Sequence, residues 1–228
     1  MARYRAEAFP RPSVAVDLVI LTIVDCELRV LLVERKEHPF RGEWALPGGF
    51  LRVGAKRGDF GEDLDAAAER ELREETGLSS GVYLEQLYTF GKANRDPRTR
   101  VLSVAHYALV RPDLVPLVRP GGDVGEVAWH EARRPPRLAF DHREILQTAL
   151  ARIRGKIDYT DIAFELVPPT FTIQELRAVH EVVKGAHQDP GNFRKRFERM
   201  VEDGLIERAP GKRLTASKPA RVYRFRRE

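Results

Sequence analysis

The sequence predicts a mixed α/β (α+β) domain followed by a smaller domain of two helices and a β-hairpin. The first observation is that apolar, β-branched runs are interrupted by one charged helix and closed by a second helix. The second is a change of charge: residues 171–228 carry 14 Lys and Arg against 8 Asp and Glu, whereas residues 1–170 carry 25 against 26. We therefore expect domains at residues 1–155 and 171–228, joined by a linker at residues 156–170.

The composition is that of a globular protein without a membrane segment. Its 228 residues are 43% hydrophobic, which is enough for a substantial core. The longest apolar run, Val14–Val24, contains Asp17 and is too short to cross a bilayer. The N-terminus lacks the apolar core of a signal peptide, and the single Cys26 cannot form an internal disulfide. We expect a cytoplasmic protein in which Cys26 is a partly buried small residue.

Five strands and two helices are expected in the first domain. Residues 13–24 are β-branched and apolar, as in a buried strand, and Asp25-Cys26-Glu27 then turns the chain. Gly77 follows the charged helix as a C-terminal stop. The other expected strands are Leu28–Glu34, Tyr83–Phe90, Val101–Val110 and Val124–His130, and the closing helix is expected at Asp141–Arg154.

The charged helix carries three glutamates on one narrow stripe. At about 100° per residue, Glu74 and Glu75 lie about 60° and 40° to either side of Glu71. Like charges at these spacings cost roughly 0.2–0.5 kcal/mol per pair, so a cation is expected beside them. Hard divalent cations such as Mg²⁺ prefer carboxylate oxygens and often bridge them to substrate phosphates. The alternative is a solvated helix face without a ligand.

These glutamates belong to a longer motif, Glu62-x7-Arg70-Glu71-Leu72-x-Glu74-Glu75-x-Gly77-Leu78, which follows Trp44-Ala45-Leu46-Pro47-Gly48-Gly49-Phe50. The motif resembles the catalytic box of the Nudix family, which cleaves nucleoside diphosphates linked to another moiety. The resemblance implies an α/β/α sandwich with a mixed sheet and Mg²⁺-assisted attack of water on a pyrophosphate. The metal ligands that it implies are Glu62, Glu71, Glu74 and Glu75. It makes Glu71 and Arg70 the catalytic residues, with Glu71 coordinating or orienting and Arg70 fixing the carboxylates by ion pairing.

One departure from the Nudix pattern lies between Gly49 and Glu62. Twelve residues separate them here, whereas the family usually has five, and the extra seven fall at residues 55–61. Because loop-closure entropy grows slowly with length, the insertion is thermodynamically tolerable. It leaves open whether Glu62 is displaced or the metal site is covered, and therefore whether hydrolysis is retained.

Two further segments, Tyr88-Thr89-Phe90 and Arg95-Asp96-Pro97-Arg98, are similar to those of Nudix proteins that handle ADP-ribose. The ligand contacts implied by this likeness are Gly48, Gly49, Asp96 and Arg98. A turn that contains Pro and Asp needs no ligand to explain it, so a plain turn is the alternative for the second segment.

The basic last quarter begins with a capped helix, Ile173–Lys184, for which Thr172 and Glu175 form a capping box. Its apolar face includes His180, which we expect to be a core histidine. Asp189-Pro190 then opens a second helix. This helix is expected at Pro190–Asp203, with Phe193, Phe197, Met200 and Val201 buried. Strands from Leu205 and Arg221 follow, with Lys212, Arg213 and Lys218 at the hairpin tip.

Helix, turn, helix and basic hairpin resemble a winged helix-turn-helix. In that module the second helix enters the major groove of DNA and the hairpin touches the backbone. On a helical wheel, Asn192, Lys195 and Arg199 share the outer face and Arg196 flanks them. The expected DNA contacts are Asn192, Lys195, Arg196, Arg199, Lys212, Arg213, Lys218 and Arg221. The alternative is a basic, solvated extension used for dimerisation.

A Nudix domain joined to such a tail resembles the Nudix-related transcriptional regulators of NAD metabolism. The likeness implies a homodimer that binds palindromic double-stranded DNA operators near NAD genes, with ADP-ribose or a related nucleotide as effector. Relatives of this architecture also govern sugar catabolism, so the regulated genes stay open. The competing function is a Mg²⁺-dependent hydrolase of ADP-ribose-type substrates, alone or combined with DNA binding.

Overall fold

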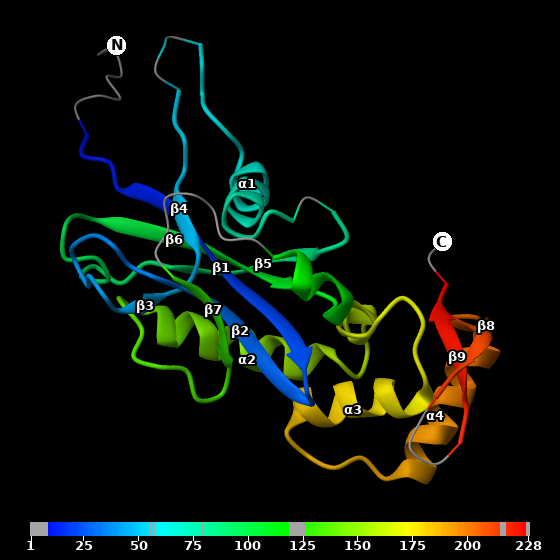
Figure 1. Cartoon of the computed structure of the whole chain (residues 1–228). Helices are drawn as coiled ribbons and strands as arrows, with labels where there is room; N and C mark the ends of the chain where they lie inside the picture. The colour runs from blue at the N-terminus through cyan, green and yellow to red at the C-terminus, as the bar shows by residue number, and fades with distance from the viewer. Residues whose placement is uncertain are drawn as a thin grey trace.

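The chain folds into a layered α/β domain and a smaller C-terminal lobe (Figure 1). The structure is a computed structural model that describes residues 9–54, 56, 58–78, 80–118, 126–214 and 218–226. A seven-stranded sheet forms the centre of the larger domain. Its strands are β1 (Ser13–Val24), β2 (Glu27–Glu34), β3 (Trp44–Ala45), β4 (Gly48–Phe50), β5 (Tyr83–Phe90), β6 (Val101–Leu109) and β7 (Val127–Glu131).

β1 is the central strand because its side chains are almost all apolar. Every residue from Ala15 to Ile23 is buried. β1 pairs antiparallel with β2 and β4 and parallel with β6. The strand order is β3-β2-β1-β6-β5, with β4 paired to β1 and β7 paired to β2. One parallel pair among antiparallel ones makes the sheet mixed, which confirms the fold expected from the resemblance.

Two helices cover opposite faces of the sheet (Figure 1). Because strand side chains alternate between faces, neighbouring residues of β1 enter different layers. Leu18 packs in the cluster that contains Leu72 of the first helix, whereas Val19 packs in the cluster that contains Ile145 of the second. The helices are α1 (Leu64–Thr76) and α2 (His142–Lys156).

Most elements predicted for this domain are confirmed. The predicted strands agree with β1, β2, β5 and β6 within a residue at each end, and Gly77 ends α1 in the left-handed conformation. The strand expected from Val124 is β7, which begins at Val127, and Val124 itself lies outside the described residues. The prediction that Cys26 is partly buried is wrong: Cys26 is exposed, because it lies in the tight turn between β1 and β2. The strands β3 and β4 were not predicted, since two or three residues are too few to give a periodic signal.

The segment predicted as a linker is packed rather than extended. α2 continues to Lys156, and a 3-10 helix, η3 (Asp161–Leu166), follows within the segment. Ile162, Phe164 and Leu166 are buried in the same cluster as the core of the larger domain. The connection therefore holds the two lobes together, and the domain boundaries at residues 155 and 171 stay a prediction.

The C-terminal lobe contains two helices and a two-stranded wing: α3 (Ile173–Lys184), α4 (Pro190–Glu202), β8 (Ile206–Arg213) and β9 (Ala220–Phe225). The capping box is confirmed, because Thr172 Oγ1 accepts from the Glu175 N–H at 3.2 Å and Glu175 Oε2 accepts from the Thr172 N–H at 2.6 Å. Asp189 caps α4 by accepting from the Asn192 N–H at 2.8 Å. This is the predicted winged helix-turn-helix arrangement.

The structure corrects two expectations for this lobe and confirms a third. Val201 was expected to be buried but is 38% exposed, because it lies at the edge of the apolar face of α4. Lys212 and Arg213 do not form the hairpin tip: they belong to β8, which continues past an irregularity in its pairing with β9. His180 is confirmed as a core residue and is fully buried.

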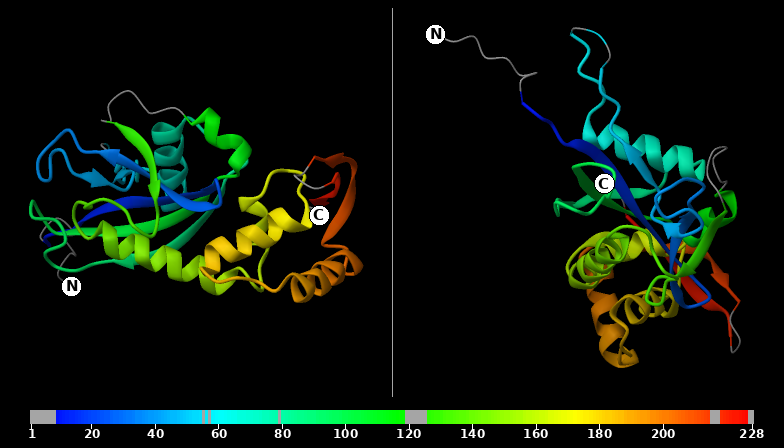
Figure 2. Two further views of the ribbon diagram at one scale, coloured as in Figure 1. Left: turned by 60° about the horizontal axis from the view of Figure 1, so that its bottom comes forward. Right: turned by 90° about the vertical axis from the view of Figure 1, so that its left-hand side faces the viewer.

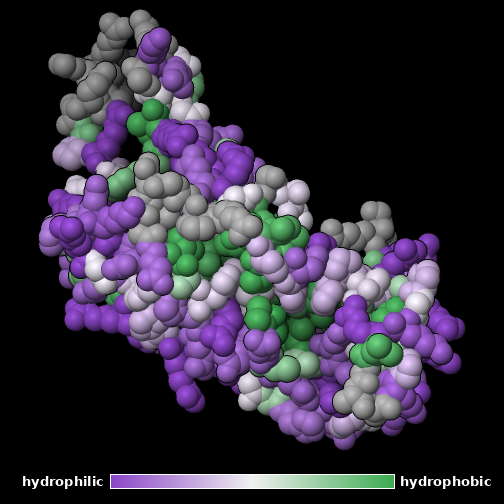
Figure 3. Space-filling view, in the orientation of Figure 1, coloured by the Kyte–Doolittle hydropathy of each residue, from purple (hydrophilic) through white to green (hydrophobic). Residues whose placement is uncertain are grey.

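The two lobes share one apolar core. Its buried members run from Val19 of β1 to Phe197 of α4 and Ile206 of β8. α3 lies beside the end of α2, as the views in Figure 2 show. Figure 3 shows a mostly hydrophilic surface on one face, with hydrophobic residues showing between the larger domain and the smaller lobe.

Polar contacts close the same boundary. Arg133, which follows β7, donates to the carbonyl oxygens of Val182 and Val183 at 2.6 and 3.1 Å. A groove of about 460 Å³ lies beside this contact and is lined by Cys26, Arg133, Gly185 and His187, among others. In the part of the chain that the structure describes, every helix is too short or too polar to span a membrane.

Candidate functional site

Arg70 is the centre of the carboxylate cluster predicted from the Nudix motif. Its guanidinium donates to Glu62 Oε1 at 2.6 Å and to Glu62 Oε2 at 2.9 Å. It also donates to Glu71 Oε1 at 2.6 Å and to Glu74 Oε2 at 3.0 Å. The expectation that Arg70 holds the carboxylates by ion pairing agrees with this geometry. The cation beside the glutamate stripe is thus supplied by the same helix.

The inserted loop does not displace Glu62. Its two ends are tied together, because the Arg52 N–H donates to Glu62 Oε1 at 2.8 Å and the Glu62 N–H donates to the Arg52 carbonyl at 3.0 Å. Hydrogen bonds from Arg70 lower the pKa of Glu62 to about 2, so Glu62 is ionised at neutral pH. A loop closed at its base leaves the motif in register, whatever its length.

Backbone and helix approach each other closely at β4. A Cβ built on Gly49 would lie 2.3 Å from Glu71 Oε1, and one on Gly48 would lie 2.2 Å from the Val16 carbonyl oxygen. A side chain at position 48 would therefore collide with the backbone of β1, and one at position 49 would push the Glu71 carboxylate out of its place in the cluster. The two glycines of the motif are explained by this proximity, which brings β4 against both β1 and the carboxylate cluster.

Burial raises the pKa of two glutamates in the cluster. For Glu75, burial and the charges of Glu71 and Glu74 raise the pKa to about 7. Burial also raises the pKa of Glu71, against the opposing effect of Arg70. Oε2 of Glu75 is buried and has no hydrogen-bond partner among the described residues.

The fit of Mg²⁺ to this cluster can be judged from its side chains. Within the described residues, no group of three His, Cys, Asp or Glu side chains is arranged to hold a metal ion. Glu62, Glu71 and Glu74 instead share Arg70, and Glu75 is buried without an ion pair to Arg70. As arranged, the four predicted ligands do not form a metal site.

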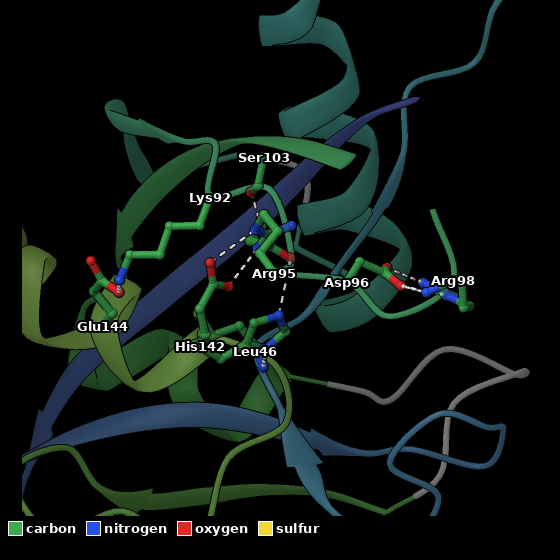
Figure 4. A network of polar contacts seen from close by, with 10 residues as sticks. Leu46, Lys92, Arg95, Asp96, Arg98, Ser103, His142 and Glu144 are labelled. Carbon is green, nitrogen blue, oxygen red and sulfur yellow. Dashed lines mark hydrogen bonds and ion pairs between the residues drawn. The ribbon is translucent and has the colours of Figure 1, made fainter. Parts of the chain in front are cut away.

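β4 also lines a cavity of about 220 Å³. All four residues predicted to contact a ligand line this cavity: Gly48, Gly49, Asp96 and Arg98. Asp96 accepts from Arg98 Nε at 3.0 Å and from Nη2 at 2.7 Å, and these hydrogen bonds lower the pKa of Asp96. The Asp96–Arg98 pair stands beside the buried network in Figure 4.

Aromatic rings and guanidinium groups form the mouth of the cavity. The Arg98 guanidinium lies 5.7 Å from the ring centroid of Phe50 and 5.8 Å from that of Phe140. The Arg35 guanidinium lies 4.8 Å from the Phe140 centroid. Arg35 donates to the Pro39 carbonyl and makes no salt bridge to the described residues, so its charge is the least neutralised at the cavity.

A buried polar network forms the inner wall (Figure 4). Arg95 donates to both oxygens of Asp141, at 2.7 and 2.9 Å, and to Asp17 Oδ2 at 3.1 Å. Ser103 Oγ donates to the same Asp17 oxygen at 2.5 Å. These contacts join β1, the β5–β6 loop, β6 and the start of α2.

His142 completes this wall from the first residue of α2. Its Nδ1 accepts from the Leu46 N–H at 2.9 Å, so in the neutral ring the proton is on Nε2, 3.6 Å from Asp17 Oδ1. Burial lowers the pKa of His142, which keeps the ring neutral.

Sequence reasoning did not assign the other charged and aromatic residues of the cavity as ligand contacts: Asp17, Arg35, Glu37, Phe50, Arg95, Phe140 and His142. One signal was present, because Asp17 is a charge within an apolar strand and a buried carboxylate needs a partner. The identity of that partner, Arg95, was not readable, since 78 residues separate the two.

The outer face of α4 carries three of the predicted DNA contacts. Asn192, Lys195 and Arg199 are exposed, and their side chains make no ion pair with the described residues. Lys212 and Arg221 are exposed and face each other across the wing, and Lys218 is exposed beside its tip. These six side chains are placed where a duplex could reach them.

Two predicted DNA contacts are instead used inside the protein. Arg196 Nη1 donates to Asp158 Oδ1 at 2.7 Å, and its Nη2 donates to the Asp158 carbonyl at 2.8 Å. Arg213 donates to Glu175 Oε1 at 2.5 Å and to the Thr170 carbonyl at 2.7 Å. A helical wheel gives the direction of a Cβ but not the partner of a long side chain, which is why these residues were grouped with the others.

We expect the Glu75→Gln variant to lose a pH dependence of stability. The pKa of Glu75 is about 7 in the folded protein, against an ordinary value of 4.5 for a solvated glutamate. Between these values the folded state holds a proton that the unfolded chain releases, so the wild-type protein loses stability as pH rises. The free energy of unfolding of Glu75→Gln relative to wild type should therefore rise by about 3 kcal/mol from pH 4.5 to 7.

Urea unfolding in EDTA at several pH values measures this difference, in which the contributions of the histidines cancel. Glu69→Gln is the matched control, because Glu69 is an exposed glutamate of the same helix. A difference that stays flat between pH 4.5 and 7 contradicts the raised pKa.

Comparison with known proteins supports two separate assignments along the chain. Residues 14–149 match the NUDIX domain family, and residues 163–225 match the NrtR DNA-binding winged helix domain. The ADPR responsive transcriptional repressor NtrR of Acinetobacter baylyi is 34% identical over 225 residues, which cover 99% of this chain and 86% of the relative.

Solved structures agree with these matches. The crystal structure of Shewanella oneidensis NrtR complexed with a 27mer DNA has a TM-score of 0.79 and 32% identity, and covers 93% of each chain. The NUDIX domain of the same protein, in a cocrystal structure with ADP ribose, has a TM-score of 0.53 and 34% identity, covering 67% of this chain and 95% of that one. The chain therefore belongs to the NrtR family, in which a Nudix domain is followed by a winged-helix DNA-binding domain.

Proposed function

We propose that this protein is a DNA-binding transcriptional repressor whose Nudix domain binds ADP-ribose or a related nucleotide as effector. The observation that carries the proposal is that one chain joins a cavity suited to a nucleoside diphosphate to a lobe with an exposed, basic helix. Two relatives support it by name: the Acinetobacter protein is an ADPR responsive repressor, and the Shewanella protein is complexed with DNA.

The cavity favours a nucleoside diphosphate on chemical grounds. Arg35 and Arg98 bring two guanidinium groups to its mouth, and guanidinium groups bind phosphate oxygens bidentately. The rings of Phe50 and Phe140 offer flat apolar surfaces on which a base can stack. Asp96 adds an acceptor for sugar hydroxyls. ADP-ribose has all three kinds of group, and the relative's NUDIX domain was crystallised with it.

The C-terminal lobe favours duplex DNA. Lys195 and Arg199 offer exposed cations on α4, and the exposed Asn192 offers an amide that can read a base edge. The wing adds Lys212, Lys218 and Arg221 for contact with the phosphate backbone. We assign DNA contact to these six residues, and a structural role to Arg196 and Arg213.

The biological setting follows from the same proposal. We propose that the protein acts as a homodimer on palindromic operators near genes of NAD metabolism, since two-fold DNA sites match two-fold proteins. We also propose that the Nudix domain spans residues 1–155, the linker residues 156–170 and the DNA-binding domain residues 171–228. We propose a cytoplasmic location, because such a regulator binds DNA there.

The nucleotide assignment predicts the effect of Arg98→Ala. This variant should bind ADP-ribose about tenfold or more weakly, because a charge-assisted hydrogen bond is lost. It should bind DNA normally when no nucleotide is present. Calorimetry measures the first quantity, and fluorescence anisotropy with a duplex selected by the wild-type protein from a random pool measures the second.

Arg134→Ala is the control for this experiment, because Arg134 is an exposed arginine that does not line the cavity. If saturating ADP-ribose leaves the affinity of the wild-type protein for the selected duplex unchanged, the effector assignment is wrong.

The DNA assignment predicts a salt signature. Lys195→Ala and Arg199→Ala should each weaken binding to the selected duplex and reduce the slope of log K against log salt by about 0.9, as expected for one lost phosphate contact. Binding of ADP-ribose should not change. Arg154→Ala, which removes an exposed arginine of α2, should leave the slope unaltered. Unchanged slopes in both α4 variants would remove α4 from the DNA interface.

A second candidate function is hydrolysis of ADP-ribose in the presence of Mg²⁺. The observation in its favour is that Glu62, Arg70, Glu71, Glu74 and Glu75 are all present, with one buried carboxylate oxygen of Glu75 unpaired among the described residues. Metal binding would require carboxylates to leave Arg70. Release of AMP that depends on Mg²⁺, is lost in Glu74→Gln and persists in Glu69→Gln would establish this activity; no release from the wild type would leave the sensor function alone.

A further inference from the structure

One carboxylate of the segment between the two lobes, that of Asp158, bonds to both α3 and α4. Asp158 lies two residues after the end of α2, and its Oδ1 and Oδ2 accept from Arg196 of α4 and Lys184 of α3, each at 2.7 Å. The Asp158 carbonyl accepts from Arg196 as well, at 2.8 Å. One residue thus holds both helices of the DNA-binding lobe.

Asp158 is negatively charged and neutralises the two cations that it contacts. Burial alone would raise the pKa of Asp158, but hydrogen bonds from Lys184 and Arg196 lower it to about 2. His180 Nδ1 lies 3.6 Å from the same carboxylate, yet burial lowers the pKa of His180 to about 4, so the ring is neutral. Without the Asp158 charge, Lys184 and Arg196 would be two neighbouring cations that repel each other.

Arg196 makes a forked contact, with two nitrogen atoms bonded to two different oxygen atoms, and a lysine cannot make this contact. Its Nη1 bonds to the Asp158 carboxylate while its Nη2 bonds to a carbonyl, and a planar guanidinium holds both directions at once. Arg196 flanks the face of α4 that carries Lys195 and Arg199. Any rotation of α4 that moved this face would break the fork.

We propose that Asp158 and Arg196 are positioning residues for DNA binding: they set the angle at which α4 is presented to the duplex. The inference rests on the proposed DNA-binding function and deepens it. Arg133 supports the same placement from the other side, because it caps the carbonyl end of α3. The structure also matches both lobes of the DNA-bound Shewanella protein in one superposition.

This role predicts weaker DNA binding in a variant for which the change of charge alone predicts tighter binding. Asp158→Asn removes a negative charge near DNA, so phosphate attraction alone would tighten binding. We expect it to weaken binding to the selected duplex by about tenfold, as for residues coupled in one ion-pair network. Arg196→Lys keeps the charge but not the fork, and should show the same loss. In both variants the slope of log K against log salt should stay at the wild-type value.

A second readout separates positioning from general loss of stability. Two α4 helices held at fixed angles should discriminate between half-site spacings. The ratio of affinities for the selected duplex and for the same duplex with one base pair inserted at its centre should therefore fall in both variants. Glu202→Gln is the matched control, because Glu202 is an exposed carboxylate at the end of α4. Circular dichroism and the affinity for ADP-ribose should match wild type in all three proteins.

The outcomes are distinguishable. Wild-type affinity and wild-type spacing discrimination in Asp158→Asn or in Arg196→Lys would overturn the positioning role. If the wild-type protein selects no duplex from the random pool, the proposed DNA-binding function itself fails, and this result does not depend on Asp158.

Discussion

The cavity depends on one buried guanidinium, that of Arg95. It comes from the loop between β5 and β6 and bonds at once to Asp17 of β1 and to Asp141 at the start of α2. Each of these carboxylates would be costly to bury alone, and so would the guanidinium. Together they satisfy one another, and the three chain segments that meet there form a wall instead of separating. The rest of the cavity, including the arginine and phenylalanine side chains at its mouth, is arranged around this wall.

A second arginine plays the same part at the Nudix motif. Two cations were predicted beside the glutamates of α1: Mg²⁺ from outside the chain, and Arg70, which the family resemblance implies as their ion-pair partner. Arg70 supplies the positive charge from within, by bonding to Glu62, Glu71 and Glu74. Both arrangements place like charges side by side and hold them with guanidinium groups, whose fixed donor geometry suits several carboxylates at once.

The parts of the fold that were predictable are those with local signals. Thr172 and Glu175 lie three residues apart, so the capping box can be recognised from a short stretch of sequence. The apolar run of β1 predicts a buried strand by itself. The parts that were not predictable join distant residues. Asp17 and Arg95 are 78 residues apart in the sequence, and Arg196 and Asp158 are 38 residues apart. A helical wheel or a strand pattern predicts the direction of each side chain. It does not predict which partner a long basic side chain contacts, because the partners come near only when the chain folds.

The one sulfhydryl group of the protein has a practical consequence. Cys26 is the sole cysteine in the sequence, it is exposed, and it lines the groove between the β1–β2 turn and the end of α3 together with Gly185 and His187. A fluorophore or nitroxide attached by maleimide chemistry would therefore sit at the seam between the lobes without prior mutagenesis. The emission of the fluorophore or the spectral line shape of the nitroxide would report on the environment of that groove in solution. The effect of each added nucleotide could then be compared without any change of sequence.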